Sequence, residues 1–219
     1  MYADNRNEEY IGRTSRISIL IRRKFSVRLM QEVAVSLLIY LICLKKERDI
    51  HMIHPDKVRE EAKKKADENY KFRSYLKGHA DEKELDRQFL RLHKELFVDY
   101  DCGKCRNCCK MYKGSIPMED VERDAEYLGI SPEQFIDFFL EKQEYEMGYQ
   151  TKHKPCDFLQ DDGECKLGDC KPDSCKKYPY TDQPERLFSL LSVLDTVEVC
   201  PVAYEIYERL KAEYRFRRR

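Results

Sequence analysis

The 219-residue chain has no tryptophan and only eight glycines and eight prolines. Gly and Pro contents this low exclude a collagen-like or low-complexity chain. Lysine and arginine together number 41, as do aspartate and glutamate, so the formal net charge is zero. This balance excludes a chain-wide positive field of the kind that attracts nucleic acid or acidic lipid. We therefore expect a folded protein without a nucleic-acid partner.

The sequence also lacks the short signatures of common catalytic sites. It has no nucleophile elbow, glycine-rich phosphate loop, His-Glu-x-x-His pair or nucleotide-binding signature. Carboxylates are abundant, but Asp161-Asp162 is better explained as a turn than as a catalytic pair. We therefore assign no catalytic residue.

Apolar runs long enough for a membrane span are missing as well. Residues 33–44 form an uncharged run of twelve residues, whereas a membrane-spanning helix needs about 20. A signal peptide would be followed by a small-residue cleavage site, but Lys45-Lys46-Glu47-Arg48 comes next. We interpret the run as a buried or amphipathic helix, or as a translated stretch upstream of a true start at Met52. A membrane partner is not expected.

Cysteine, in contrast, is abundant, with ten residues in the chain. Four lie within eight positions, in the run Cys102-Gly103-Lys104-Cys105-Arg106-Asn107-Cys108-Cys109. Five more follow, at Cys156, Cys165, Cys170, Cys175 and Cys200. Two thiolates three residues apart can both reach one ion from a single turn, which is a common local geometry for zinc and iron–sulfur ligation. The sequence therefore predicts a metal-binding protein.

A disulfide scaffold is the alternative use of so many cysteines. Secreted scaffolds of that kind are usually shorter than this chain and are made with a signal peptide. Here long Glu/Lys-rich stretches precede the cysteines, and adjacent Cys108 and Cys109 cannot easily pair with each other. We therefore favour reduced, metal-bound thiols, which implies a cytoplasmic location.

We divide the chain into three parts: an N-terminal extension at 1–51 that need not belong to the fold, a charged helical region at 52–99, and a cysteine-cluster metal-binding domain at 100–219 with a C-terminal helix. The helical region predicts two helices. The apolar stripe of the first consists of Val58, Ala62, Ala66 and Tyr70, and that of the second of Leu85, Phe89, Leu92 and Leu96. The second stripe packs on the cysteine domain or, alternatively, binds a protein partner.

The cysteine domain predicts a mixed fold. A helix over 118–128 ends at Gly129, and a second begins at the capping sequence Ser131-Pro132-Glu133-Gln134 and buries Phe135, Phe138 and either Phe139 or Leu140. Residues 155–167 predict a short hairpin, 187–199 a strand or a helix, and 201–214 a final helix. The expected fold class is α+β, mostly α-helical, with a small metal-stabilised cysteine domain.

Placing the first cysteine run on one helix separates its members. Cys102, Cys105 and Cys109 would share a face, and Cys108 would point off it. Adjacent side chains seldom serve one tetrahedral ion, so Cys108 and Cys109 serve different metals, or one of them is a spare or reactive thiol. His153, close to Cys156, is interpreted as a solvated loop residue and not as a ligand.

The cysteine motifs resemble those of the YkgJ-type CxxCxxCC cysteine-cluster family, which is described as a zinc- or iron-chelating domain. The matching features are the first run, Cys156-Asp157-Phe158-Leu159, Gly163-x-Cys165, Pro172-x-x-Cys175 followed by Tyr178-Pro179, and Cys200-Pro201, and they cover residues 100 to about 205. Gly168 and Lys171 replace the Tyr and Arg usual in the family. The resemblance implies eight metal ligands: Cys102, Cys105, Cys108, Cys109, Cys156, Cys165, Cys175 and Cys200. It leaves out Cys170 and Cys43.

Two classes of function remain open. In the first, the chain binds zinc or iron, including an iron–sulfur cluster, in a structural, chelating or assembly role. In the second, it is an iron–sulfur enzyme or redox partner related to cysteine-cluster proteins, some of which are flagellin lysine N-methylases. All-thiolate sites suit both metals, so the sequence does not choose between zinc and iron.

Overall fold

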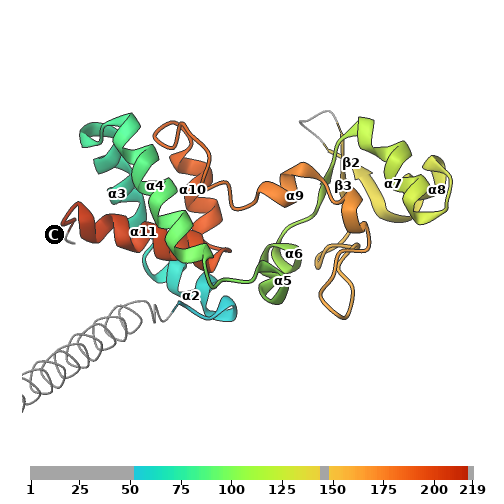
Figure 1. The fold of residues 1–219 in the computed structure, drawn as a ribbon, viewed down its shortest axis with the longest axis horizontal. Coiled ribbons are helices and arrows are strands. Elements are labelled where there is room, and N and C mark those ends of the chain that lie inside the picture. Colours follow the sequence, from blue (N-terminus) through green and yellow to red (C-terminus); the bar gives the residue numbers. More distant parts are fainter. Residues whose placement is uncertain (1–51, 144–147, 217–219) are drawn as a thin grey trace, which may run out of the picture. The chain divides into compact units, whose positions relative to one another are not determined.

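The computed structural model describes residues 52–143 and 148–216. The apolar run at 33–44, Cys43 and the last three arginines lie outside the described residues. The described part is mostly α-helical with one small antiparallel sheet, which confirms the predicted fold class (Figure 1). None of its helices is long and apolar enough to cross a membrane.

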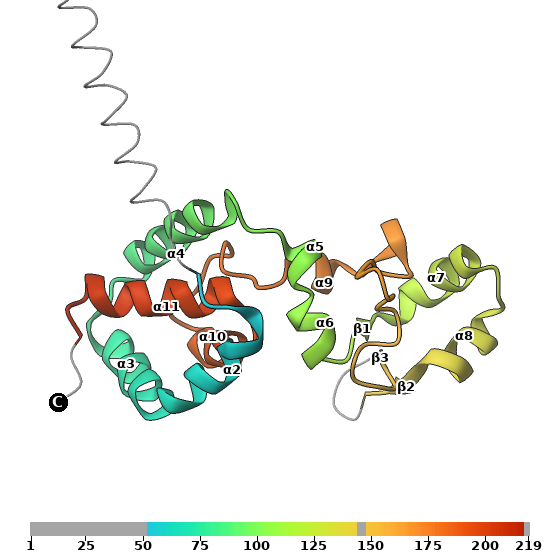
Figure 2. The same ribbon diagram turned by 90° about the horizontal axis from the view of Figure 1, so that it is seen from below.

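Helices from both ends of the described chain pack together, and we call them the helical group. They are α2 (Pro55–Lys64), α3 (Ala66–His79), α4 (Glu82–Phe97), α10 (Leu190–Val197) and α11 (Pro201–Glu213). Helix α11 contacts α2, α4 and α10, and α10 also contacts α2 and α3 (Figures 1 and 2). The segment 187–199, for which strand and helix were both open, therefore contains a helix.

The apolar face of α4 is used inside the chain. Asp81 caps the helix by accepting a hydrogen bond from the backbone N–H of Glu84. All four residues of the predicted stripe are buried, and α4 contacts α11. This confirms the interpretation of the stripe as a packing face, and it leaves that face unavailable to a partner.

The predicted stripe of the first helix is only half right. Val58 and Ala62 are buried, but Tyr70 is 55% exposed. The helix is interrupted at Lys65 (φ −102°, ψ 10°), so the helical period does not continue from α2 into α3. The buried face of α3 is therefore made by Asn69, Phe72 and Leu76.

The ring of Phe72 lies at the centre of an aromatic cluster in the helical group. It is fully buried, and its centroid lies 5.2 Å from that of Tyr207 and 5.0 Å from that of Phe216. We expect Phe72→Ala to lower the free energy of unfolding by about 3–5 kcal/mol, because it leaves a cavity in a packed core. Tyr70→Ala on the same helix is the control, with an expected change of about 0.5 kcal/mol or less. Urea unfolding followed by circular dichroism measures both, and equal losses would contradict the assignment.

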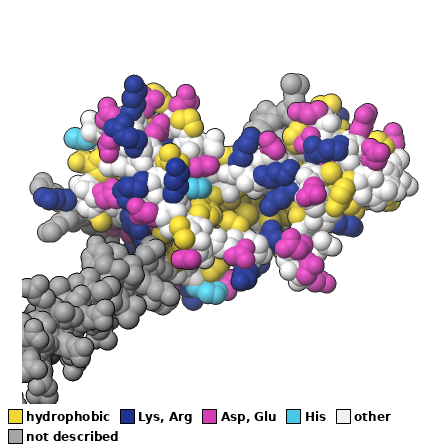
Figure 3. Space-filling view, viewed as in Figure 1, with side chains coloured by type: hydrophobic (Ala, Val, Ile, Leu, Met, Phe, Trp, Pro, Cys, Tyr) yellow, Lys and Arg dark blue, Asp and Glu magenta, His cyan; other side chains and the backbone are white. Residues whose placement is uncertain are grey.

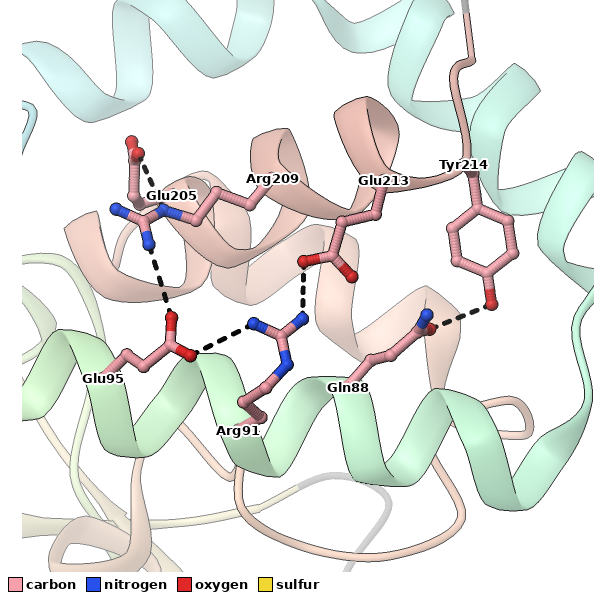
Figure 4. A network of polar contacts seen from close by, with 7 residues as sticks. All are labelled: Gln88, Arg91, Glu95, Glu205, Arg209, Glu213 and Tyr214. Atoms are coloured by element: carbon pink, nitrogen blue, oxygen red, sulfur yellow. Dashed lines mark hydrogen bonds and ion pairs between the residues drawn. The ribbon is translucent and has the colours of Figure 1, made fainter. Parts of the chain in front are cut away.

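Charged side chains connect the outer surfaces of α4 and α11 (Figure 4). Arg91 contacts both Glu95 on its own helix and Glu213 on α11. Arg209 of α11 contacts Glu95 and Glu205 in turn. Exposed ion pairs contribute only about 0–1 kcal/mol each. The apolar face of α4 therefore supplies most of the attraction, and the ion pairs favour one alignment of the two helices.

The cysteine segment consists of short elements. They are α5 (Cys102–Cys105), α6 (Asn107–Met111), β1 (Ser115–Ile116), a 3₁₀ turn (Met118–Asp120), α7 (Val121–Leu128), α8 (Pro132–Phe139), β2 (Leu140–Lys142), β3 (Tyr149–Thr151), a second 3₁₀ turn (Gly168–Cys170) and α9 (Asp173–Lys177). The antiparallel sheet has the order β1-β3-β2, with Gln150 paired to both Ser115 and Glu141. The sequence did not predict this sheet.

The two predicted helix boundaries in this segment are confirmed. Gly129 (φ 69°) ends α7 in the left-handed conformation that glycine tolerates. Ser131 and Gln134 form the capping box that starts α8. The expected burial of Phe138 is wrong, since this residue is 56% exposed. The core side of α8 faces Phe158, whose ring contacts Phe135 and Phe139 one helical turn apart, and Phe138 lies beyond that contact.

The core of the cysteine segment is small. Its buried members are Ile116, Val121, Ala125, Phe135, Leu140, Phe158 and Leu167. The predicted hairpin is present in a minimal form, with one bridge between Leu159 and Cys165 and a turn in which Asp162 accepts a hydrogen bond from the N–H of Glu164. Much of the chain from 152 to 189 therefore has no regular ladder to support it.

Candidate metal centre

The first cysteine run is broken at Arg106, which has left-handed backbone geometry (φ 50°) and separates α5 from α6. Its side chain holds the turn, because Nε donates to the carbonyl of Gly103 (2.8 Å) and the guanidinium pairs with Glu164 (2.8 Å). The prediction that Cys102, Cys105 and Cys109 share one helical face is therefore wrong, since no continuous helix carries them.

One group of cysteines lies between the first run and the start of α11, and we call it the first group. Its members are Cys102, Cys105, Cys108 and Cys200. The side chain of Asn107 donates to the carbonyl of Val199 (2.6 Å), which holds the start of α6 against the residue preceding Cys200. The thiols interact electrostatically: Cys102 and Cys105 raise the pKa of Cys200, and Cys200 raises that of Cys108.

The environment of Cys200 contains two opposing influences. The residue is buried, and burial raises the pKa of its thiol to about 12. The backbone N–H groups of Val202 and Ala203, at the start of α11, act in the opposite direction and favour the thiolate. The predicted Cys-Pro start of the last helix therefore brings amide donors to a candidate ligand.

Two tyrosine hydroxyls border the first group. The hydroxyls of Tyr100 and Tyr178 are buried and have no hydrogen-bond partner among the described residues. Burial raises the pKa of both; Cys105 raises that of Tyr100 further, and Cys200 that of Tyr178. An unsatisfied buried hydroxyl costs about 1–3 kcal/mol. Thiolate sulfur bound to a metal would accept these hydrogen bonds, so the surroundings of the first group fit a metal–thiolate site.

The other four cysteines form a second group. Cys109, Cys156, Cys165 and Cys175 all line one small cavity of about 30 Å³. The backbone N–H of Cys156 donates to the carbonyl of Cys109 (2.8 Å), which ties the two segments together. Burial is the main cause that raises the pKa of Cys156, Cys165 and Cys175, the last to about 11. This all-sulfur donor set also suits zinc or iron.

Cys108 and Cys109 stand at the boundary between the two groups. Their sulfur atoms are 4.0 Å apart. The hydrogen bond between them lowers the pKa of Cys109 to about 6 and raises that of Cys108. Cys108 interacts with Cys200 of the first group, whereas Cys109 interacts with Cys156, Cys165 and Cys175 of the second. The two adjacent residues therefore interact with different groups.

Two cations lie among the thiols. Lys171 lowers the pKa of five cysteines: Cys102, Cys108, Cys109, Cys165 and Cys175. Arg106 does the same for Cys102, Cys109 and Cys165. Both side chains favour the thiolate form that metal binding requires. Lys171 thus keeps a positive charge at the place where the family usually has arginine.

A larger cavity of about 560 Å³ opens beside the second group. It is lined by Cys109, Cys156 and Cys175 of that group, by Cys108 of the first, and by Tyr112, Tyr178, Tyr180, Lys113, Lys154 and Lys171. Figure 3 shows hydrophobic side chains, a class that includes Cys and Tyr, in the middle of the described residues, with Lys and Arg side chains near α9. No Asp or Glu is among the lining residues.

The structure also bears on disulfide bonds, on clusters of possible metal ligands, and on the two residues left out of the ligand set, Cys170 and His153. None of the nine described cysteines forms a disulfide. Within the described residues, no three His, Cys, Asp or Glu side chains are placed closely enough to hold a metal ion. Cys170 packs at the edge of the small core. His153 is exposed and pairs with Asp157 (2.6 Å), as expected for a solvated loop residue.

The comparisons with known proteins identify the cysteine segment. Residues 101–201 match the CxxCxxCC family, whose description is "Putative zinc- or iron-chelating domain". The CxxCxxCC match confirms the resemblance inferred from the cysteine motifs, and it supports metal-ion binding by this segment. No curated protein and no solved structure matches the chain significantly.

Three residues near the CxxCxxCC cysteines were given no role at the site from the sequence. Tyr100 and Tyr178 carry the unpartnered hydroxyls, and Arg106 makes the turn within the first run. Each lies within three residues of a cysteine, and Tyr178 also belongs to one of the motifs that carry the family resemblance. Glycine stands at position 168, where the family usually has tyrosine. A side chain at this position would collide with the hydroxyl of Tyr127.

Proposed function

We propose that residues 101–201 bind two metal ions, one in each cysteine group, and that the bound metals hold this segment in its folded form. The first site consists of Cys102, Cys105, Cys108 and Cys200, and the second of Cys109, Cys156, Cys165 and Cys175. The observation that carries the proposal is the division of the eight cysteines into two groups of four. Four thiolates make one complete tetrahedral site. Coordination of this kind requires the groups to close by a small movement around each ion.

The chemistry of the proposed sites favours a structural or chelating role. Four thiolates around a divalent ion leave no open position for a substrate, which is the property of a closed structural site. Such a site carries a net charge of about −2. Lys171 and Arg106 provide positive charge beside the thiols and thereby lower the cost of gathering thiolates. Zinc and iron both suit the donor set.

Metal content tests the proposal directly. We expect the protein purified without oxygen to carry about two metal ions per chain, measured by elemental analysis together with protein quantitation. Zinc gives a colourless protein, whereas iron–thiolate coordination gives visible charge-transfer absorption. Cys170→Ser is the matched control, because this cysteine belongs to neither group, and it should keep both ions. A chain that binds no metal, or in which Cys170→Ser loses as much metal as Cys165→Ser, would refute the two-site arrangement.

An iron–sulfur redox role is the second candidate. It is favoured by the 560 Å³ cavity, which lies within the range of ligand-binding cavities and is bordered by cysteines of both groups. A reversible bleaching of visible absorption by dithionite, with acid-labile sulfide in the protein, would support this role over the structural one. A colourless zinc protein would eliminate it.

A further inference from the structure

Unpartnered buried hydroxyls lie near both cysteine groups: those of Tyr100 and Tyr178 near the first, and that of Ser174 beside Cys175 of the second. Both unpartnered tyrosine hydroxyls interact with cysteines of the first group. Tyr112 is the third tyrosine nearby, and its hydroxyl already donates to the backbone carbonyl of Asp195 (2.9 Å). The tyrosines near these thiols are therefore of two kinds, with and without a hydrogen-bond acceptor among the described residues.

Packing fixes both unpartnered hydroxyls in place. The ring of Tyr178 contacts that of Tyr112 edge-on, with centroids 5.9 Å apart, and Tyr178 lines the same cavity as Cys108. Tyr100 lies two residues before Cys102. Its ring contacts that of Phe97 at the end of α4, with centroids 6.0 Å apart. Because both hydroxyls are buried, water does not offer them an easy alternative acceptor. Both hydroxyls interact with sulfur atoms of the first group, and sulfur becomes a much better acceptor as a thiolate.

We propose that Tyr100 and Tyr178 are positioning residues that donate O–H···S hydrogen bonds to the metal-bound thiolates of the first site. This inference rests on the proposed function, since it needs a metal in that site. Hydrogen bonds from outside the coordination sphere orient the ligands and withdraw charge from them. Loss of such a partner typically costs about 10-fold to 100-fold in metal affinity. The second site has the unpartnered hydroxyl of Ser174 beside Cys175, so the proposal for Tyr100 and Tyr178 concerns the first site alone.

Cobalt(II) is the probe for the experiment, because its thiolate charge-transfer bands report on the bound sulfurs. A Cys165→Ser background weakens the second site, so the absorption arises mainly from the first. In that background we expect Tyr100→Phe and Tyr178→Phe each to move the bands to longer wavelength, since a sulfur without its hydrogen bond is easier to oxidise. We also expect about 10-fold weaker cobalt binding in competition with a chelator. Tyr→Phe keeps the ring, so folding is preserved.

Tyr112→Phe is the matched control. It removes a hydroxyl in the same neighbourhood that already has a backbone acceptor, so both the bands and the affinity should stay as they are. Unchanged bands and affinity in both test variants would overturn the inference and leave the proposed function standing. Equal changes in Tyr112→Phe would also overturn it. If the background protein and the wild type bind no cobalt at all, the proposed function itself fails.

Discussion

Removal of the metal is expected to unfold residues 100–186 while the helical group keeps its structure. The cysteine segment has few means of holding itself together, with strands of two or three residues and a buried core of seven side chains. Small domains of this kind commonly depend on metal, and structural zinc supplies about 10–16 kcal/mol of apparent binding free energy in zinc-finger peptides. Without metal, the thiols contribute only ordinary apolar contacts.

The helical group has a different source of stability. Phe72, Leu85, Phe89, Ile206 and Tyr207 are almost completely buried, and they come from three long helices. Burial of each large apolar side chain contributes about 1.5–3 kcal/mol. Cys200 is the one proposed ligand on these helices, at the very start of α11. Metal loss should therefore fray this end of α11 without dissolving the group.

Hydrogen exchange measured peptide by peptide separates the two parts. After treatment with a strong chelator under reducing conditions, we expect protection to fall to that of an unfolded chain in 100–186 and to persist in 55–97 and 190–213. Restoring the metal should restore protection, which controls for irreversible damage. Unchanged protection in α7 and α8 would contradict a folding role for the metal. A loss across both parts would show that the helical group depends on the metal as well.

Local signals in the sequence predicted much of the fold. The capping box at Ser131, Gly129 at the end of α7 and the Leu85–Leu96 stripe are each specified within one or two helical turns, and each is found as predicted. Such features depend on backbone hydrogen bonds and helical periodicity that neighbouring residues determine. The family resemblance likewise followed from short motifs around the cysteines and is confirmed for residues 101–201.

The turn within the first cysteine run and the small sheet were less predictable, because both depend on residues far apart in the sequence. A left-handed arginine carries no sequence signature, yet Arg106 decides how α5 and α6 are oriented, and its contact with Glu164 spans 58 positions. The sheet joins strands of two and three residues, too short for any alternation to be seen. The exposure of Tyr70 and Phe138 was not predicted either. Tyr70 is exposed because the helix breaks before α3, and Phe138 because Phe158 packs on the other side of α8.

Replacement of either neighbouring cysteine, Cys108 or Cys109, is expected to remove a different metal ion. The two sulfur atoms are only 4.0 Å apart, yet they interact with different groups of cysteines. The sequence allowed this division but also allowed a spare or reactive thiol at either position. We propose the division because Cys108 interacts with Cys200, whereas Cys109 interacts with Cys156, Cys165 and Cys175. Cys108→Ser should therefore empty the first site, and Cys109→Ser the second.

Native mass spectrometry of the zinc-loaded variants can count and assign the losses. We expect each single variant to retain about one ion where the wild type holds about two, and the double variant to retain none. Adding Cys200→Ser to Cys108→Ser should cost no further ion, because both belong to the first site, whereas adding Cys200→Ser to Cys109→Ser should remove the remaining one. Cys170→Ser provides the control with both ions present. If Cys108→Ser and Cys109→Ser behaved identically in both combinations, the two residues would share one centre, and the division of the eight cysteines into two sites would be wrong.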